Sequence, residues 1–290
     1  DYFGASYGTK LGATYADLFP ERVGRMVLDG AVDLSISSRQ LSLQQAAGFE
    51  TALRAYVADC VAQGDCVLGD SVEEGLATIK GLLDQVDQDP MPTSGSRDLE
   101  VGNAFYGIVL PLYNRDYWPY LTQGLEAALD GDGTLLLRFS DIYNSRSARG
   151  GYTDNSTEAN YAINCLDNPW SIPADEVPAQ LPAFEKASPT FGTVFAWGLT
   201  GCGGIEVEAT EHDRHIDAEG AAPIVVVGTT RDPATPYQWA QHLADQLDSG
   251  VLVSRDGDGH TGYNSGNECV DTAIEDYLVD GTVPDDGLSC

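Results

Sequence analysis

The stretch GASYG, residues 4–8, stands near the start of the chain in DYFGASYGTK (residues 1–10) and has the form G-x-S-x-G. This pattern is typical of a nucleophilic serine on a sharp turn between a strand and a helix, the nucleophile elbow. It places Ser6 at the turn. Gly4 and Gly8 would allow the turn to pack without clashes from Cβ atoms. Because glycine and serine are common residues, the pattern needs support from the sequence around it.

The residues after Ser6 predict a helix followed by a strand. Gly8 and Gly12 are four residues apart, so one side of the helix could approach a sheet closely. Pro20 ends the helical pattern, and RMVLD (25–29) is typical of a short buried strand. The apolar residues Leu11, Tyr15, Leu18 and Phe19 fall on one helical face.

The last 70 residues have the same alternating character. APIVVVG (222–228) is a continuous apolar run rich in β-branched residues, as in a parallel strand covered on both faces. A helix over 236–247, a strand over 250–254 and a helix over 269–279 follow. Alternating strands and helices predict an α/β sheet.

The long middle of the chain predicts mainly helices, over 41–58, 72–86, 119–129 and 176–187, with a loop at 150–157 that carries the sequon Asn155-Ser156-Thr157. We therefore expect three segments: a first part of the core (1–34), a helical cap or insertion (35–220) and a C-terminal part of the core (221–290).

Two further residues complete a catalytic pattern with Ser6. Asp232 follows the strand at 223–228, and His260 follows the strand at 251–254. Ligands and catalytic groups gather at the carboxyl ends of parallel strands, and the order Ser, Asp, His is that of the α/β-hydrolases. We predict Ser6 as nucleophile, His260 as base and Asp232 as the carboxylate that orients it, with the Tyr7 N–H as an oxyanion donor.

Other residues compete for these roles. Asp256 and Asp258 lie in the same predicted loop as His260, whereas Asp232 follows a separate strand. His242 falls within a predicted helix, and His212 and His215 precede Asp232, which is the wrong order.

Composition limits the kinds of partner. A net charge of −30, from 45 acidic and 15 basic residues, argues against binding to nucleic acid or anionic membranes. No apolar run reaches the ~18 residues that a membrane span requires.

The six cysteines indicate three disulfides and an oxidising compartment, hence a secreted protein, although six cysteines allow 15 pairings. Locality favours Cys60–Cys66, Cys165–Cys202 and Cys269–Cys290. The spacing lacks C-x-x-C, so we expect no zinc or other metal, and no cofactor.

Residues 4–33, AINCLD (162–167), GC (201–202), DPATP (232–236) and GHT (259–261) together resemble the secreted actinobacterial tripeptidyl aminopeptidases, which are related to the proline iminopeptidases. The resemblance spans nearly the whole chain. It implies an α/β-hydrolase core with a helical cap, release of short peptides from free N-termini, and the same disulfide pairing.

An exopeptidase must recognise the substrate ammonium, and a carboxylate in the cap could do so. Asp167 is the candidate, although it could equally cap a local turn. Tyr161, Trp170, Phe195 and Trp197 could line substrate pockets or form the core of the cap.

The chain departs from the family in one respect, because members carry about half a sheet before the elbow, including a glycine-containing loop that supplies the second oxyanion donor. We therefore expect these 290 residues to be the C-terminal part of a longer polypeptide. Its N-terminal segment would be a partner, as a cleaved but associated chain, or would be absent. Two other functions stay open: an esterase or amidase for small molecules, and a non-catalytic binding protein with the hydrolase fold.

Overall fold

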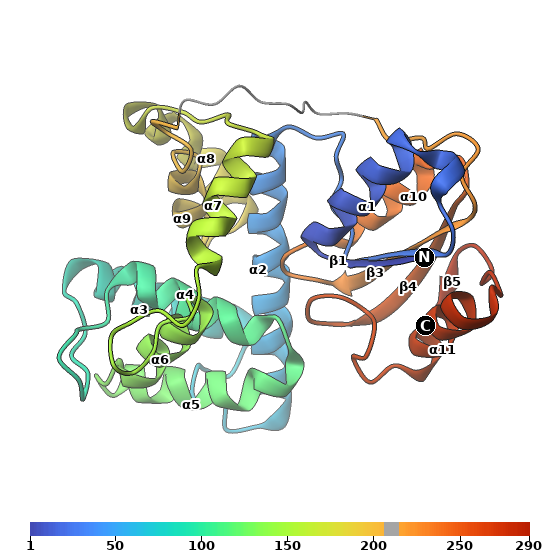
Figure 1. Cartoon of the computed structure of the whole chain (residues 1–290). Coiled ribbons are helices and arrows are strands. Elements are labelled where there is room, and N and C mark those ends of the chain that lie inside the picture. Colours follow the sequence, from blue (N-terminus) through green and yellow to red (C-terminus); the bar gives the residue numbers. More distant parts are fainter. Residues whose placement is uncertain (206–214) are drawn as a thin grey trace. The chain divides into compact units, whose positions relative to one another are not determined.

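The computed structural model describes residues 1–205 and 215–290, and the chain divides into two compact units (Figure 1). One unit combines Asp1–Gly48 with Asp213–Cys290. The other unit is Phe49–His212. The sequence predicted a helical insertion over 35–220, whereas residues 35–48 and the described residues 215–220 fall in the first unit.

A parallel five-stranded sheet in the order β1-β2-β3-β4-β5 forms the centre of the first unit. The α/β class predicted from sequence is thereby confirmed. The strands are β1 (Tyr2–Ala5), β2 (Met26–Asp29), β3 (Ile224–Arg231), β4 (Gly250–Asp258) and β5 (Leu288–Ser289). The third and fourth strands extend beyond the predicted ends, and β5 was not predicted.

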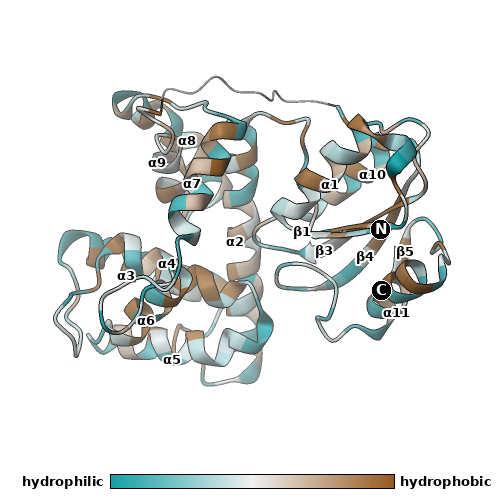
Figure 2. Ribbon diagram, viewed as in Figure 1, coloured by the Kyte–Doolittle hydropathy of each residue, from teal (hydrophilic) through white to brown (hydrophobic). Residues whose placement is uncertain are grey.

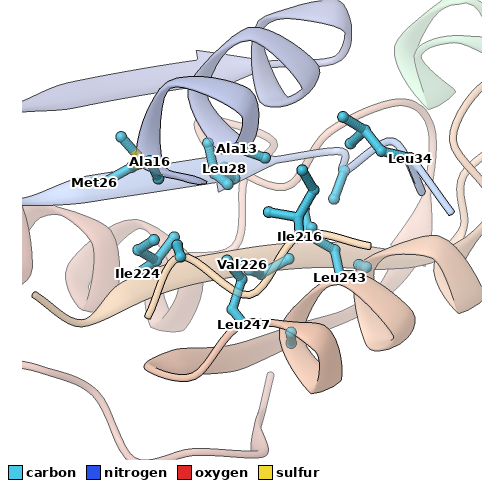
Figure 3. Close-up of a cluster of buried hydrophobic side chains, with 14 residues drawn as sticks. Ala13, Ala16, Met26, Leu28, Leu34, Ile216, Ile224, Val226, Leu243 and Leu247 are labelled. Atoms are coloured by element: carbon cyan, nitrogen blue, oxygen red, sulfur yellow. The ribbon is translucent and has the colours of Figure 1, made fainter. Parts of the chain in front are cut away.

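Helices cover both faces of this sheet, because alternate strand residues point in opposite directions. On one face, Leu28 and Val226 pack with residues of α1 (Tyr7–Leu18) and α10 (Tyr237–Gln246), as Figure 3 shows. On the other face, Val27 and Val225 pack against α11 (Glu268–Asp280). Aliphatic side chains dominate both clusters, which explains the continuous hydrophobic run at 224–227 and the brown colour of β3 in Figure 2.

Helix α1 does not bury the face that carries its large apolar side chains. Gly12, Ala13 and Ala16 are buried, whereas the larger side chains of Leu11 and Leu18 are 59% and 55% exposed. A Cβ on Gly12 would lie 2.7 Å from Leu28 Cδ2, so only a small residue allows this approach. The sheet therefore receives the small face of α1, and the apolar face lies outside.

The second unit is helical in its described residues, apart from two isolated β-bridges. It contains the continuation of α2 (Ser38–Gln63), which begins in the first unit, and then seven helices: α3 (Val72–Gln88), α4 (Val101–Leu112), α5 (Trp118–Leu129), α6 (Thr134–Tyr143), α7 (Ser156–Asp167), α8 (Val177–Ala187) and α9 (Gly192–Gly198). Four of the eight were not predicted, namely α4, α6, α7 and α9. The sequon residue Asn155 immediately precedes α7.

A buried carboxylate joins segments of the helical unit that are distant in sequence. Glu50 of α2 accepts hydrogen bonds from the Ser188 hydroxyl at 2.6 Å and from the Thr190 N–H at 3.1 Å. Both donors lie between α8 and α9, so this contact fixes that connection to α2.

All three disulfides predicted by locality are present, Cys60–Cys66, Cys165–Cys202 and Cys269–Cys290. The third ties α11 to the last residue of the chain. In the part of the chain that the structure describes, no helix is both long enough and apolar enough to cross a membrane.

Candidate active site

Ser6 occupies a strained turn between β1 and α1. Its backbone has φ 54° and ψ −121°, a combination that residues with a Cβ rarely adopt. The Ser6 N–H donates to the Asp29 carbonyl at 2.9 Å. Its own carbonyl accepts from the Thr9 N–H at 2.9 Å and from the Thr9 hydroxyl at 2.7 Å. Hydrogen bonds of both backbone groups of Ser6, with Asp29 and with Thr9, thus fix the turn.

The two glycines of the elbow have different roles. A Cβ on Gly4 would lie 2.5 Å from the Gly8 carbonyl oxygen, so no other residue fits there without displacement. A Cβ on Gly8 would meet only the Tyr2 hydroxyl at 3.4 Å, an ordinary contact. The expectation that both glycines prevent clashes therefore holds for Gly4 alone. Tyr7 is the first residue of α1, so its N–H lies at the positive end of the helix dipole.

Asp232 and His260 lie in contact beyond the ends of β3 and β4. The His260 Nδ1 is 3.0 Å from Asp232 Oδ1 and 2.9 Å from Oδ2. The carboxylate is buried and accepts three further hydrogen bonds from the backbone, from the N–H groups of Ala234, Thr235 and Thr261. Since Asp232 is an acceptor, Nδ1 is assigned as the donor, which leaves Nε2 of the neutral imidazole to accept a proton.

The environment of His260 raises its pKa above 6.5. Burial acts in the opposite direction, because it disfavours the imidazolium. The negative charge of Asp232 and the hydrogen bond to it outweigh burial, and Asp29 adds to them. The site therefore stabilises the imidazolium that forms when His260 accepts a proton.

The elbow and the histidine loop meet at the end of β2. A Cβ on Gly30, which has φ 67°, would lie 3.3 Å from His260 Cε1 and 3.1 Å from Thr235 Oγ1. The preceding residue, Asp29, holds the Ser6 N–H through its carbonyl. The structure thus gathers the segments of all three predicted residues at one edge of the sheet.

The competing aspartates have another partner. Arg231 Nε lies 2.6 Å from Asp258 Oδ1, and its Nη1 lies 2.7 Å from Asp256 Oδ1. These contacts raise the pKa of Arg231, chiefly through the hydrogen bond to Asp258, and the hydrogen bond to Arg231 lowers the pKa of Asp256. Both carboxylates therefore form ion pairs with the Arg231 guanidinium.

The other histidines lie elsewhere. His242 Nδ1 is 3.0 Å from the buried Asp33 Oδ2, so this histidine of α10 pairs with the segment after β2. His215 is exposed, and His212 lies outside the described residues. Within the described ranges, no group of three or more His, Cys, Asp or Glu side chains could hold a metal ion.

Sequence reasoning missed two residues next to the pair. Thr235 Oγ1 lies 3.0 Å from Asp232 Oδ2 and 3.3 Å from His260 Nδ1. The buried Asp29 accepts the N–H groups of Gly262 and Tyr263, just after His260. The position of Asp29 as the last residue of a predicted strand was a usable signal, since parallel strands bring their carboxyl ends together.

The residues predicted for substrate recognition lie in the helical unit. Asp167 is the last residue of α7 and is half-buried. A cavity of about 680 Å³ in this unit is lined by Tyr161, Glu100 and Glu158, among others, and Asp167 is not part of its lining. Trp170 and Trp197 are 43% and 47% exposed, so neither is a core residue of its unit, whereas Phe195 contacts the rings of Phe49 and Phe105.

Comparison with known proteins relates this geometry to hydrolases. Residues 188–290 match the family model of the TAP-like proteins. The chain is 37% identical over 299 residues to serine protease Hip1 of Mycobacterium tuberculosis, covering all of this chain and 57% of that protein. It is 39% identical over 280 residues to carboxylesterase B of the same species, covering 94% of this chain and 53% of the relative.

A third relative carries the name of a peptidase. The chain is 26% identical over 296 residues to tripeptidyl aminopeptidase of Streptomyces lividans, which covers all of this chain and 54% of that protein. The chain thus spans little more than half the length of the relatives it matches.

Proposed function

Since the chain is a TAP-like α/β-hydrolase by its fold and by the match of residues 188–290, we propose that it carries the catalytic residues of a secreted serine exopeptidase. The relatives support the broader class, a serine hydrolase. The observation that carries the proposal is the buried Asp232–His260 pair at the same sheet edge as a strained Ser6.

The proposed reaction follows from the protonation states of these groups. The Ser6 Oγ attacks the substrate carbonyl while its proton passes to His260 Nε2, and Asp232 stabilises the resulting imidazolium. The tetrahedral oxyanion accepts the Tyr7 N–H at the start of α1. Collapse expels the amine of the new N-terminus, which takes the proton from His260. Water activated by His260 then hydrolyses the acyl-enzyme and frees the N-terminal peptide.

The exopeptidase assignment requires that the substrate ammonium be recognised. We assign this role to Asp167 in the helical unit, with release of tripeptides as the expected product. Asp167→Asn is expected to raise KM for peptides with a free N-terminus and to leave esters without an amine unaffected. The matched variant Glu158→Gln changes a carboxylate that lines the cavity of the same unit. An equal or larger effect of the Glu158 variant would move the ammonium site to the cavity.

The first experiment is chemical labelling and turnover in the full-length protein. A fluorophosphonate probe is expected to label Ser6, and Ser6→Ala is expected to lose both labelling and activity. Tripeptidyl chromogenic amides are expected to react much faster than their N-acetylated forms. Equal turnover of acetylated peptides would contradict an exopeptidase.

An esterase or amidase for small molecules is the second candidate. The 39% identity to carboxylesterase B, against 26% to tripeptidyl aminopeptidase, favours it. Faster turnover of simple esters than of peptidyl amides would support this alternative. Absence of probe labelling would instead support a non-catalytic binding protein.

Two features support the proposed location and partner. Three disulfides fit an oxidising, extracellular compartment. In the described sheet, β1 pairs on one side only, with β2, while α1 beside it exposes Leu11 and Leu18. We propose that a further strand of the same polypeptide, in the same or a separate chain, pairs with this edge.

A further inference from the structure

Asp29 contacts both the elbow and the histidine loop. It is the last residue of β2 and is 1% exposed. Through its backbone carbonyl it accepts the Ser6 N–H at 2.9 Å. Through its side chain it accepts the Gly262 N–H at Oδ1, at 2.7 Å, and the Tyr263 N–H at Oδ2, at 2.9 Å. A single residue therefore bonds to both segments that the proposed reaction must bring together.

The loop that begins at His260 needs such support. Thr261 has φ 71°, which is unfavourable for a β-branched residue and persists only where the surroundings enforce it. The Thr261 N–H donates to Asp232 Oδ2 at 3.0 Å. The next two amides, of Gly262 and Tyr263, donate to Asp29. Three successive N–H groups thus donate to two buried carboxylates, Asp232 and Asp29.

We propose that Asp29 is a positioning residue for the reaction at Ser6, one that fixes the His260 loop to the sheet and sets its distance from the elbow. This inference rests on the proposed function, because it assumes that Ser6 and His260 react together. Asp29 makes no contact with the substrate in this role. It acts through the backbone of the residues that carry the reacting groups.

The negative charge of Asp29 also affects the pKa of His260, an effect that a residue with a purely structural role would not have. Two charged groups that act on His260, Asp232 after β3 and Asp29 on β2, both favour its imidazolium. Asp29 is itself faced by Asp232 and His260, and by Arg255 of β4. Burial raises the pKa of Asp29, whereas the amides of Tyr263 and Gly262 lower it by favouring the carboxylate.

The test is Asp29→Asn in the full-length protein. The amide has the shape of the carboxylate but no charge, and its NH₂ group would face one of the two loop amides. We expect kcat to fall by roughly 10- to 100-fold with KM little changed, as for a small displacement of a reacting group. We also expect the acid limb of the kcat/KM profile to move to lower pH, because His260 loses a neighbouring negative charge.

Asp33→Asn is the matched control. Asp33 is also a buried carboxylate in the segment after β2, but it bonds to Ser35 and His242 rather than to the histidine loop. Its variant is expected to keep the wild-type pH profile. A purely structural role of Asp29 would lower stability in unfolding experiments without moving the acid limb, and this result would overturn the proposal.

A second variant tests the same contact from the loop side, in case the Asp29 variant does not fold. A Cβ on Gly262 would lie 2.8 Å from Val227 Cγ1, so Gly262→Ala must force the loop and the Val227 side chain of β3 apart. We expect kcat to fall while the fluorophosphonate probe still labels Ser6, more slowly. Wild-type kcat in either variant would refute the positioning role. An active Ser6→Ala enzyme would instead refute the proposed function itself.

Discussion

At the scale of single residues, the chemistry depends on which group His260 touches. The hydrogen bond to Asp232 places a proton on Nδ1, and burial makes that interaction strong because little water screens it. The raised pKa of His260 has opposite consequences for activity and for stability. Catalysis needs the neutral imidazole, whereas the folded state favours the imidazolium.

The first prediction concerns pH. We expect kcat/KM to rise with pH through an apparent pKa above 6.5, the ordinary value for histidine, since Asp232 and Asp29 together overcome the effect of burial. The contribution of His260 to folding is fully present below pH 6.5 and is lost as pH rises through the folded pKa. Rate profiles and unfolding free energies measured across the same pH range check both signs. An acid limb below 6.5 would contradict this description of the site.

The second prediction distinguishes Asp232 from the competing aspartates near His260. Asp232→Asn is expected to reduce kcat by about 10⁴-fold, because the amide favours the wrong tautomer of the histidine. Asp256→Asn removes an exposed carboxylate that bonds to Arg231, and we expect little change in kcat. Steady-state kinetics of the two variants with a peptidyl amide provide the measurement. Comparable losses of kcat in both variants would mean that Asp256, in the loop of His260, also acts on the histidine.

At the scale of elements, the sequence predicted those parts that repeat simple patterns. The strand at 26–29 and the part of β3 up to residue 228 follow from short apolar runs, and the helix at 237–246 follows from its helical pattern. The helix α4 was missed because it contains Pro111, and β5 because two residues carry no pattern. The triad candidates were accessible because each follows a strand. The end of a predicted strand also marked the location of Asp29, but its hydrogen-bond partners could not be predicted, since Gly262 and Tyr263 lie more than 230 positions away.

Helix α1 also shows why the largest apolar residues do not always mark the buried face. Gly12 and Ala16 allow the helix backbone to approach β1 and β2, and larger residues at these positions would force the layers apart. Close packing of a helix on a sheet therefore depends here on small side chains.

The third prediction follows from that approach. Gly12→Ala would gain about 1 kcal/mol of helix propensity, but its Cβ would lie 2.6 Å from Tyr2 Cε1, and overpacking costs roughly 1–3 kcal/mol. We therefore expect net destabilisation. Gly81→Ala in α3 is the control, because a Cβ there meets nothing within 4 Å and should stabilise by about 0.5–1 kcal/mol. Urea unfolding of both variants measures the difference, and stabilisation by Gly12→Ala would disprove the close contact.

At the scale of the whole molecule, an acidic chain with a net charge of −30 must resist its own repulsion. Three disulfides oppose unfolding by restricting the unfolded chain, two of them in the helical unit and one in the sheet unit. Each closes a loop of a different length, so the loss of entropy on closure differs among them.

The last prediction ranks the three bonds by loop length. Cys165–Cys202 spans 37 residues, Cys269–Cys290 spans 21 and Cys60–Cys66 spans 6. Loop-closure entropy gives stabilisations of about 4, 3 and 2 kcal/mol in that order. Replacing each pair by serines and measuring unfolding under oxidising conditions tests the ranking, and each variant serves as a control for the other two. Because Cys269–Cys290 joins α11 to the residue that follows β5, its loss should also loosen the sheet face that α11 covers. A larger effect from Cys60–Cys66 than from Cys165–Cys202 would show that native contacts, rather than the unfolded chain, determine what the disulfides contribute.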